Sequence, residues 1–188
     1  MIFRETALPG AFVIDLERHA DARGFFARSF CRDEFAAHGL VTAWAQSNVS
    51  FNARRGTVRG MHWQVEPEVE VKLVRCTAGA LYDVIVDLRP DSSSLGRSVG
   101  VELSADDRRM LYVPAGFAHG FVTLRDETEV FYEMSHPHAP EAARGFRFDD
   151  PRIGIEWPEP CKVISDRDAG YPDLPDDLSR LVTGGVAG

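Results

Sequence analysis

One short run of the chain contains residues that could transfer a proton: Arg59-Gly60-Met61-His62-Trp63-Gln64. In a strand, successive side chains point to opposite faces, so Met61 and Trp63 would share one face. The arginine, histidine and glutamine cannot all be buried without partners, because each unpaired polar group would cost on the order of 1–3 kcal/mol. Histidine is the side chain that titrates nearest neutrality, which makes His62 a candidate general base. A core histidine bonded to a neighbouring group is the alternative interpretation.

A second run, Pro114-Ala115-Gly116-Phe117-Ala118-His119-Gly120-Phe121, resembles the second half-motif of the cupin jelly rolls. In metal-binding cupins the first half-motif carries two histidines separated by one residue and followed by a glutamate, whereas this chain offers only His62-Trp63-Gln64. A mononuclear metal site needs three or four converging ligands, and only His62 and His119 can be assembled here. We therefore expect no metal and no cofactor.

Polar side chains recur along the short segments that are expected to be strands, and they are too many for a dry interior. They are Gln46, Asn48, Arg59, His62, Gln64, Lys72, Asp83, His119 and Tyr132. Inward positions of a small barrel either fill its lumen or line a ligand cavity. A polar cavity with arginines indicates an anionic, hydroxyl-rich ligand, because arginine makes bidentate contacts to phosphate. Arg23, Arg59 and Arg75 are the candidates, each with a rim or surface charge as its alternative role.

The elements that would position these residues are short strands separated by Gly, Pro, Asp and Ser. We expect strands at 11–16, 43–50, 58–64, 72–77, 80–88, 97–103, 109–113, 120–124 and 129–134, and another that follows a turn at 21–26 and continues through 29–30. Many evenly spaced strands favour an all-β antiparallel jelly roll or barrel. Short helices are expected at 32–39, which ends at Gly39, and at 174–181, and residues 183–188 are expected to be frayed.

Bulk properties limit the class of protein. A chain of 188 residues without internal repeats predicts one domain, 1–188. The net charge of -8 argues against a nucleic-acid partner or an anionic membrane surface, but not against a small anionic ligand. Cys31, Cys76 and Cys161 are odd in number and widely spaced, which predicts free thiols in a reducing compartment. With no signal-peptide pattern and no membrane-spanning apolar run, we expect a cytoplasmic protein.

From about Asp21 to Asp168 the chain resembles the dTDP-4-dehydrorhamnose 3,5-epimerase family. Each matching piece is weak alone, but their occurrence together in this order is specific. Besides the two runs that contain His62 and His119, the pieces are 21–26, 46–50, 72–75, 82–87, Tyr132, 154–158 and 165–168. The resemblance implies a cupin-type jelly roll and a cofactor-independent isomerase. Such an enzyme inverts C3, C5 or both of a nucleoside-diphosphate 4-keto-6-deoxyhexose, most directly dTDP-4-dehydro-6-deoxyglucose.

Inversion beside a ketone requires a base on one face, a group that stabilises the enolate oxygen, and an acid on the opposite face. By resemblance, His62 is the base and Asp168 is the carboxylate that orients it. Lys72 resembles the cation that faces the C4 oxyanion, and Tyr132 resembles the acid.

The resemblance also implies how the nucleotide is held. Arg23 and Arg59 would bind the diphosphate with Gln46 and Asn48 nearby, Phe26 would lie near the base, and His119 would line the sugar pocket. In this family the strand that bears Arg23 and Phe26 reaches across a dimer interface, so a homodimer is expected.

Three departures from the family pattern surround the expected nucleotide and sugar rim. Where the family commonly has a glutamate near position 28 that contacts the nucleoside, this chain has Arg28, which we therefore include among the substrate-binding candidates. Residues 135–140 lack the usual tyrosines, and the loop at 66–71 is acidic. None of these changes touches the acid–base set, so the natural base and sugar stay open.

Three alternatives remain. A single-position epimerase would use the same residues. From a different class, a cupin sugar-binding module would not need His62, Lys72 and Tyr132 together, and a metal-dependent oxygenase would need the missing histidine pair.

Overall fold

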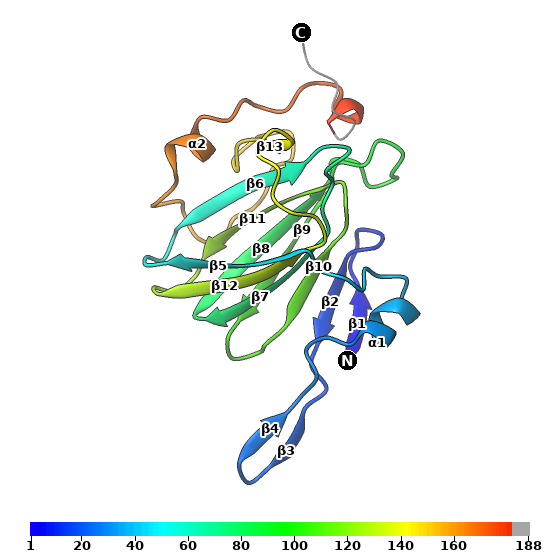
Figure 1. The fold of residues 1–188 in the computed structure, drawn as a ribbon. Helices are drawn as coiled ribbons and strands as arrows, with labels where there is room; N and C mark the ends of the chain where they lie inside the picture. Colours follow the sequence, from blue (N-terminus) through cyan, green and yellow to red (C-terminus); the bar gives the residue numbers. More distant parts are fainter. Residues whose placement is uncertain (182–188) are drawn as a thin grey trace.

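Two antiparallel sheets face each other in the computed structural model, which describes residues 1–181 (Figure 1). The six-stranded sheet has the order β1 (Ile2–Glu5), β2 (Phe12–Asp15), β10 (Met110–Val113), β7 (Lys72–Ala78), β12 (Thr128–Met134) and β5 (Gln46–Asn52). The five-stranded sheet has the order β13 (Ala143–Gly145), β6 (Val58–Gln64), β11 (Phe117–Thr123), β8 (Ala80–Asp87) and β9 (Ser98–Ser104). The expected all-β antiparallel fold class is confirmed.

The apolar core lies between the two sheets because strand alternation turns one set of side chains inward from each of them. Val74 and Leu111 project from the six-stranded sheet and meet Leu81 and Ile85 from the five-stranded sheet. The outer face of the five-stranded sheet, including Met61 and Trp63, is covered by the chain that follows β13. Helix α1 (Arg32–Ala37) covers part of the outer face of the six-stranded sheet through the fully buried Phe35.

A separate hairpin of β3 (His19–Asp21) and β4 (Gly24–Phe26) extends away from both sheets (Figure 1). Its residues are exposed throughout. The expected turn is present, but the strand does not continue through 29–30 as expected, because β4 ends at Phe26. Strand β3 lies between the expected strands and pairs locally with β4.

Most strand positions were predicted to within a few residues, and the difference that matters for the site concerns β11. It begins at Phe117, directly after Gly116, whose φ of 79° turns the chain, so His119 lies inside a strand paired with β8. Strands β1 and β13 and helix α2 (Asp166–Ala169) were not expected. The helix expected at 174–181 is only the 3-10 turn η1 (Leu178–Arg180). The prediction of fraying at 183–188 falls outside the described residues.

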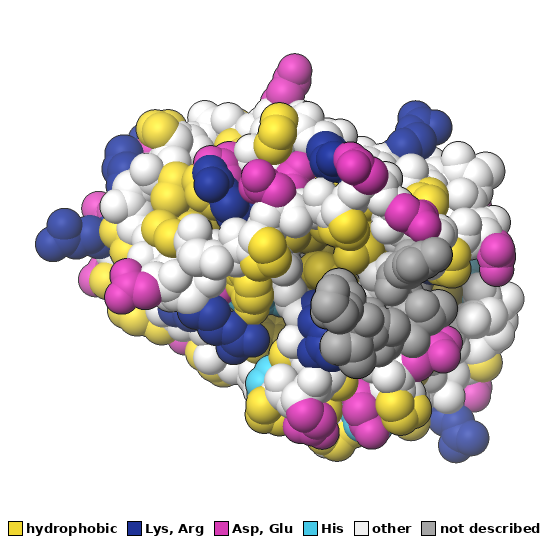
Figure 2. All heavy atoms as spheres, turned by 90° about the horizontal axis from the view of Figure 1, so that it is seen from above, with side chains coloured by type: hydrophobic (Ala, Val, Ile, Leu, Met, Phe, Trp, Pro, Cys, Tyr) yellow, Lys and Arg dark blue, Asp and Glu magenta, His cyan; other side chains and the backbone are white. Residues whose placement is uncertain are grey.

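The surface seen in Figure 2 mixes charges of both signs: Lys and Arg side chains are interspersed with Asp and Glu side chains. In the described part of the chain, no helix is long and apolar enough to cross a membrane. The three cysteines are free, as expected from their number and spacing.

Candidate active site

A cavity of about 590 Å³ lies between the two sheets, with walls from β5, β7 and β12 on one side and β6 and β11 on the other. Most of the predicted site residues line it, although they are spread over more than a hundred positions of the sequence. They are Gln46, Asn48, Arg59, His62, Lys72, His119, Tyr132 and Asp168. The cavity therefore gathers the side chains with which the protein could do chemistry.

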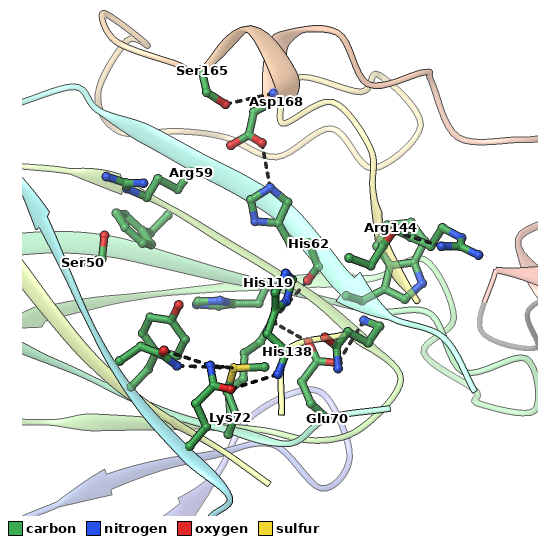
Figure 3. A pocket seen from close by; sticks show the side chains of 18 of the residues that line it. Ser50, Arg59, His62, Glu70, Lys72, His119, His138, Arg144, Ser165 and Asp168 are labelled. Atoms are coloured by element: carbon green, nitrogen blue, oxygen red, sulfur yellow. Dashed lines mark hydrogen bonds and ion pairs between the residues drawn. The ribbon is translucent and has the colours of Figure 1, made fainter. Parts of the chain in front are cut away.

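His62 and Asp168 form a titratable pair at the cavity wall (Figure 3). Oδ1 of Asp168 lies 2.8 Å from Nε2 of His62, and Oδ2 accepts a hydrogen bond of 3.1 Å from the backbone N–H of Gly60. Burial by itself would raise the pKa of Asp168, but the hydrogen bonds from His62, Gly60 and Ser165 outweigh it and hold the pKa below its ordinary value. Asp168 is thus a carboxylate placed to accept a hydrogen bond from Nε2–H of His62, and Nδ1 is the ring nitrogen that Asp168 does not contact.

The position of Asp168 is set by the start of helix α2. Ser165 is the N-cap residue, and its hydroxyl oxygen accepts a 3.1 Å hydrogen bond from the backbone N–H of Asp168. The Asp168 side chain is buried, whereas that of His62 is 39% exposed toward the cavity. This arrangement shields the orienting carboxylate and leaves the imidazole accessible to a ligand.

An irregularity in β6 brings Arg59 and His62 to the same face of the sheet. In a regular strand, residues three apart point to opposite faces. Here His62 pairs with His119 and Arg59 pairs with Phe121, so two residues of β6, Gly60 and Met61, stand opposite the single residue between that pair on β11. This extra residue is a β-bulge, and it lets both polar side chains enter the cavity while Met61 stays buried in the core.

Gly60 in the bulge also helps to hold Asp168 in place. Because its N–H faces away from the ladder, it can donate to Oδ2 of Asp168. Its φ of 124° favours glycine, and a Cβ at this position would lie 2.5 Å from the Cα of Gly120. Only glycine fits this close approach between β6 and β11.

Lys72 and Tyr132 project from the six-stranded sheet, opposite the wall that carries His62. Nζ of Lys72 lies 2.9 Å from Oε1 of Glu70 and 3.5 Å from the carbonyl oxygen of His62. Burial raises the pKa of the Tyr132 phenol, so the phenol keeps its proton at neutral pH. His62 therefore stands on one wall of the cavity, and a protonated phenol and the Lys72 side chain stand on the facing wall.

His119 forms a second buried pair. Its Nε2 lies 2.7 Å from Oδ1 of Asp83, whose side chain is fully buried. Because Asp83 holds one ring nitrogen, the other nitrogen of His119 is available to a ligand in the cavity.

Gln64 connects the strand that carries His62 to the cavity rim. Its Oε1 accepts a 2.7 Å bond from the N–H of Ala139, and its Nε2 donates to the carbonyl oxygens of Glu68 at 2.7 Å and Pro137 at 3.3 Å. One buried side chain thus binds both loops that border the cavity, residues 65–71 and 135–142.

The residues expected to bind the nucleotide form hydrogen bonds with neighbouring polar side chains. Nε of Arg59 donates to Oδ1 of Asn52 at 2.8 Å, and Nε2 of Gln46 donates to Oδ1 of Asn48 at 2.9 Å. Such bonds reduce the entropy that would be lost when a ligand binds.

Three predicted substrate-binding residues do not line the cavity of their own chain. Arg23 is 90% exposed and pairs with Asp21, Phe26 is 74% exposed on the hairpin, and Arg28 pairs with Glu34. One further phosphate candidate, Arg75, lies on the other face of the six-stranded sheet, over the ring of Phe131. It is three residues from Lys72 in a strand, so it must point the opposite way.

Several lining or supporting residues were not singled out from the sequence: Glu70, Ser165, Arg144 and Arg167. The two arginines add guanidinium groups to that of Arg59.

The acidic loop at 66–71 is tolerated because two of its carboxylates are paired: Glu70 with Lys72, and Glu68 with His136 at 2.7 Å. The position of Glu70 two residues before Lys72 could have indicated this pair from the sequence, because such residues share a face of an extended chain.

Among residues 1–181, no group of three or more His, Cys, Asp and Glu side chains could hold a metal ion.

Comparison with known proteins gives a consistent result. Residues 5–176 match the family model described as dTDP-4-dehydrorhamnose 3,5-epimerase. A protein of that name from Sinorhizobium fredii is 42% identical over 175 residues, which cover 93% of this chain and 90% of that protein.

Solved structures are similar over the same extent. The dTDP-4-dehydrorhamnose 3,5-epimerase of Bacillus anthracis, with TDP and PPi bound, superposes with a TM-score of 0.88 at 38% identity, covering 92% of this chain and 99% of that chain. The dTDP-6-deoxy-D-glucose-3,5-epimerase of Legionella pneumophila, in complex with dTDP-4-keto-L-rhamnose, gives a TM-score of 0.88 at 31% identity, covering 99% of both chains.

Proposed function

This chain belongs to the dTDP-4-dehydrorhamnose 3,5-epimerase family, and we propose that it inverts C3 and C5 of dTDP-4-dehydro-6-deoxyglucose by acid–base chemistry in the cavity between its sheets. The observation that carries the proposal is the His62–Asp168 pair on one wall, opposite Lys72 and Tyr132 on the other. This arrangement supports the base, oxyanion donor and acid that such an inversion needs.

In the proposed reaction, Nδ1 of His62 removes the proton from the carbon beside the C4 ketone. The imidazolium that forms is stabilised by the Asp168 carboxylate 2.8 Å from Nε2. The electron pair left on carbon moves into the ketone, and the Lys72 ammonium donates a hydrogen bond to the resulting C4 oxyanion. Tyr132 then delivers its proton to the same carbon from the opposite face, which inverts the centre.

The diphosphate is proposed to bind Arg59, with Gln46 and Asn48 nearby and His119 toward the sugar. Arg23, Phe26 and Arg28 cannot serve their own chain's cavity in the observed arrangement. We propose that they serve the cavity of a second subunit in a homodimer. The exposed hairpin, and the exposed Phe26 in particular, support this role because a large apolar side chain on a projecting strand favours a protein contact.

The reaction is tested by proton NMR of dTDP-4-dehydro-6-deoxyglucose in deuterated water with the purified protein. Deuterium should enter at both C3 and C5, with the inverted product accumulating. Entry at one carbon alone would identify a single-position epimerase. No entry, although a dTDP-sugar binds, would identify a sugar-binding module, and stoichiometric iron with oxidised product would identify an oxygenase.

The shared site is tested by mixing two defective variants, His62→Ala and the double variant Arg23→Ala with Phe26→Ala. If the hairpin acts in its partner's site, a mixed dimer holds one intact site. Random exchange makes half of the dimers mixed, so the mixture should regain about a quarter of wild-type activity. No gain, when differently tagged subunits are shown to exchange, would contradict a contribution from the second subunit.

A cytoplasmic location is kept as part of the proposal. The free thiols of Cys31, Cys76 and Cys161 support a reducing compartment. Fractionation of cells that produce the protein tests it, and recovery outside the cytoplasm would contradict it.

A further inference from the structure

The ammonium group of Lys72 is held in place before any ligand arrives. Lys72 and Glu70 are both buried, with side chains 9% and 5% exposed. Nζ of Lys72 contacts Oε1 of Glu70 at 2.9 Å and the carbonyl oxygen of His62 at 3.5 Å. An ammonium has three N–H donors, so these two contacts leave one donor free. Lys72 lines the cavity, and this donor is the one available to a ligand there.

Glu70 bonds to a second donor on its other side. Its Oε2 accepts a 3.0 Å hydrogen bond from the backbone N–H of Gln64. One carboxylate therefore joins β6, which carries His62, to Lys72 at the start of β7. A carboxylate is the side chain that can accept from two donors at once with both of its oxygens, whereas an amide of the same shape has a single acceptor oxygen.

From these contacts we infer that Glu70 is a positioning residue of the reaction, which aims the Lys72 ammonium at the C4 oxygen and fixes its distance from His62. The inference rests on the proposed role of Lys72. Glu70 bears a negative charge, so it does not itself stabilise a developing oxyanion. Its effect is geometric, because it holds the Lys72 ammonium on β7 at a fixed position relative to β6, the strand that carries His62.

Positioning has a characteristic kinetic signature. The residues proposed to bind the nucleotide, Arg59, Gln46 and Asn48, form hydrogen bonds with residues other than Glu70, so loss of Glu70 should change KM little. The enolate-forming step depends on the angle and distance of the Lys72 donor, and a misplacement of about 1 Å costs about 10²-fold in rate. We expect Glu70→Gln to lower kcat about 10²-fold with KM within about 3-fold of wild type.

A conservative pair of variants separates positioning from packing. Glu70→Gln keeps the shape of the side chain but has one acceptor for two donors, whereas Glu70→Asp is shorter but keeps both acceptors and the charge. If Glu70 acts through its charge and its two acceptor oxygens, Glu70→Asp should have a higher kcat than Glu70→Gln. If Glu70 acts only by filling space, Glu70→Gln should have the higher kcat, and that result would overturn the inference.

The matched control is Glu68→Gln, which removes the same charge from the same loop. Glu68 pairs with His136 outside the cavity lining, so this variant should keep wild-type kcat. Lys72→Met and its combination with Glu70→Gln complete the set. If Glu70 acts through Lys72, the double variant should be no slower than Lys72→Met alone.

The outcomes distinguish two failures. If Lys72→Met is slow but Glu70→Gln matches Glu68→Gln, the inference about Glu70 is wrong and the proposed role of Lys72 survives. If Lys72→Met keeps wild-type kcat, both are wrong. A loss in Glu70→Gln that adds fully to that of Lys72→Met would also overturn the inference, since Glu70 would then act on another group.

Discussion

Replacement of Asp168 by asparagine tests the proposed base most directly, because the two side chains differ by one acceptor and one charge. In the wild-type chain two donors converge on the carboxylate: Nε2–H of His62 at 2.8 Å and the N–H of Gly60 at 3.1 Å. The asparagine amide offers one oxygen for both. If that oxygen faces His62, its NH₂ group meets the buried N–H of Gly60, and an unpaired buried donor costs about 1–3 kcal/mol.

The favoured arrangement therefore turns the oxygen toward Gly60 and the NH₂ group toward His62. Nε2 must then accept, which moves the ring proton to Nδ1, the nitrogen that would face the substrate. A comparable tautomer change in a hydrolase triad lowers kcat by about 10⁴. The imidazolium also loses its counter-charge. We expect kcat to fall by about 10³–10⁴, which corresponds to about 4–5.5 kcal/mol at 1.36 kcal/mol per tenfold change.

The assay is the rate of deuterium entry at C3 and C5 in deuterated water, followed by proton NMR under saturating substrate. Asp166→Asn is the matched control, since Asp166 lies on the same short helix but its exposed side chain does not line the cavity. Thermal unfolding of both variants separates a folding defect from a chemical one. A rate for Asp168→Asn within about tenfold of the control would refute Asp168 as the residue that sets the tautomer of His62.

Three further predictions concern the acid, the bulge and a buried carboxylate. Tyr132→Phe should still admit deuterium through His62, but inverted product should form at least about 10²-fold more slowly, which NMR of the same reaction resolves; equal losses of exchange and inversion would contradict its role as the acid. Gly60→Ala should lower the free energy of unfolding by about 2–5 kcal/mol in urea titrations, because the alanine Cβ would lie 2.5 Å from the Cα of Gly120. A variant as stable as the wild type would contradict the need for glycine at this position. Burial by itself would raise the pKa of Asp87, but hydrogen bonds, the largest from Arg89, bring it to about 2 from 3.8. This carboxylate should contribute about 2 kcal/mol of stability above pH 4, and that contribution is lost as the pH falls toward 2. Asp87→Asn should remove this part of the acid sensitivity in urea titrations between pH 2 and 7, and an unchanged pH dependence would contradict the prediction.

Local patterns explain why much of the strand framework could be predicted. The bounds of β6 were predicted as observed, since alternating apolar residues lie between turn-forming neighbours. The placement of Lys72 and Tyr132 at the cavity follows from the same periodicity, because a residue's face is settled by its parity within a strand. Arg75 was considered as a phosphate contact because of its charge alone. Its position three residues after Lys72 places it on the opposite face of the strand, over the ring of Phe131.

The remaining features depend on contacts that no local pattern encodes. Gly60 places one extra residue in β6, and from sequence alone the bulge is indistinguishable from a regular strand that would turn Arg59 away from the cavity. Asp168 meets His62 only after the intervening chain has wrapped around the five-stranded sheet. Resemblance to a family, rather than spacing, led to that pairing. Among the described residues, the pairing of the hairpin at 19–26 does not extend beyond Phe26, and its sequence alone does not mark that end.

The three backbone bonds made by Gln64 bear on how this fold can diversify. Both loops at the cavity mouth are pinned through main-chain atoms, at Glu68, Pro137 and Ala139, which every amino acid supplies except for the missing N–H of proline. Side chains along the rim can therefore be exchanged while the aperture keeps its dimensions. In directed evolution toward other nucleotide sugars, libraries at 66–68 and 135–138 should retain a high fraction of folded members as long as Gln64 is left untouched.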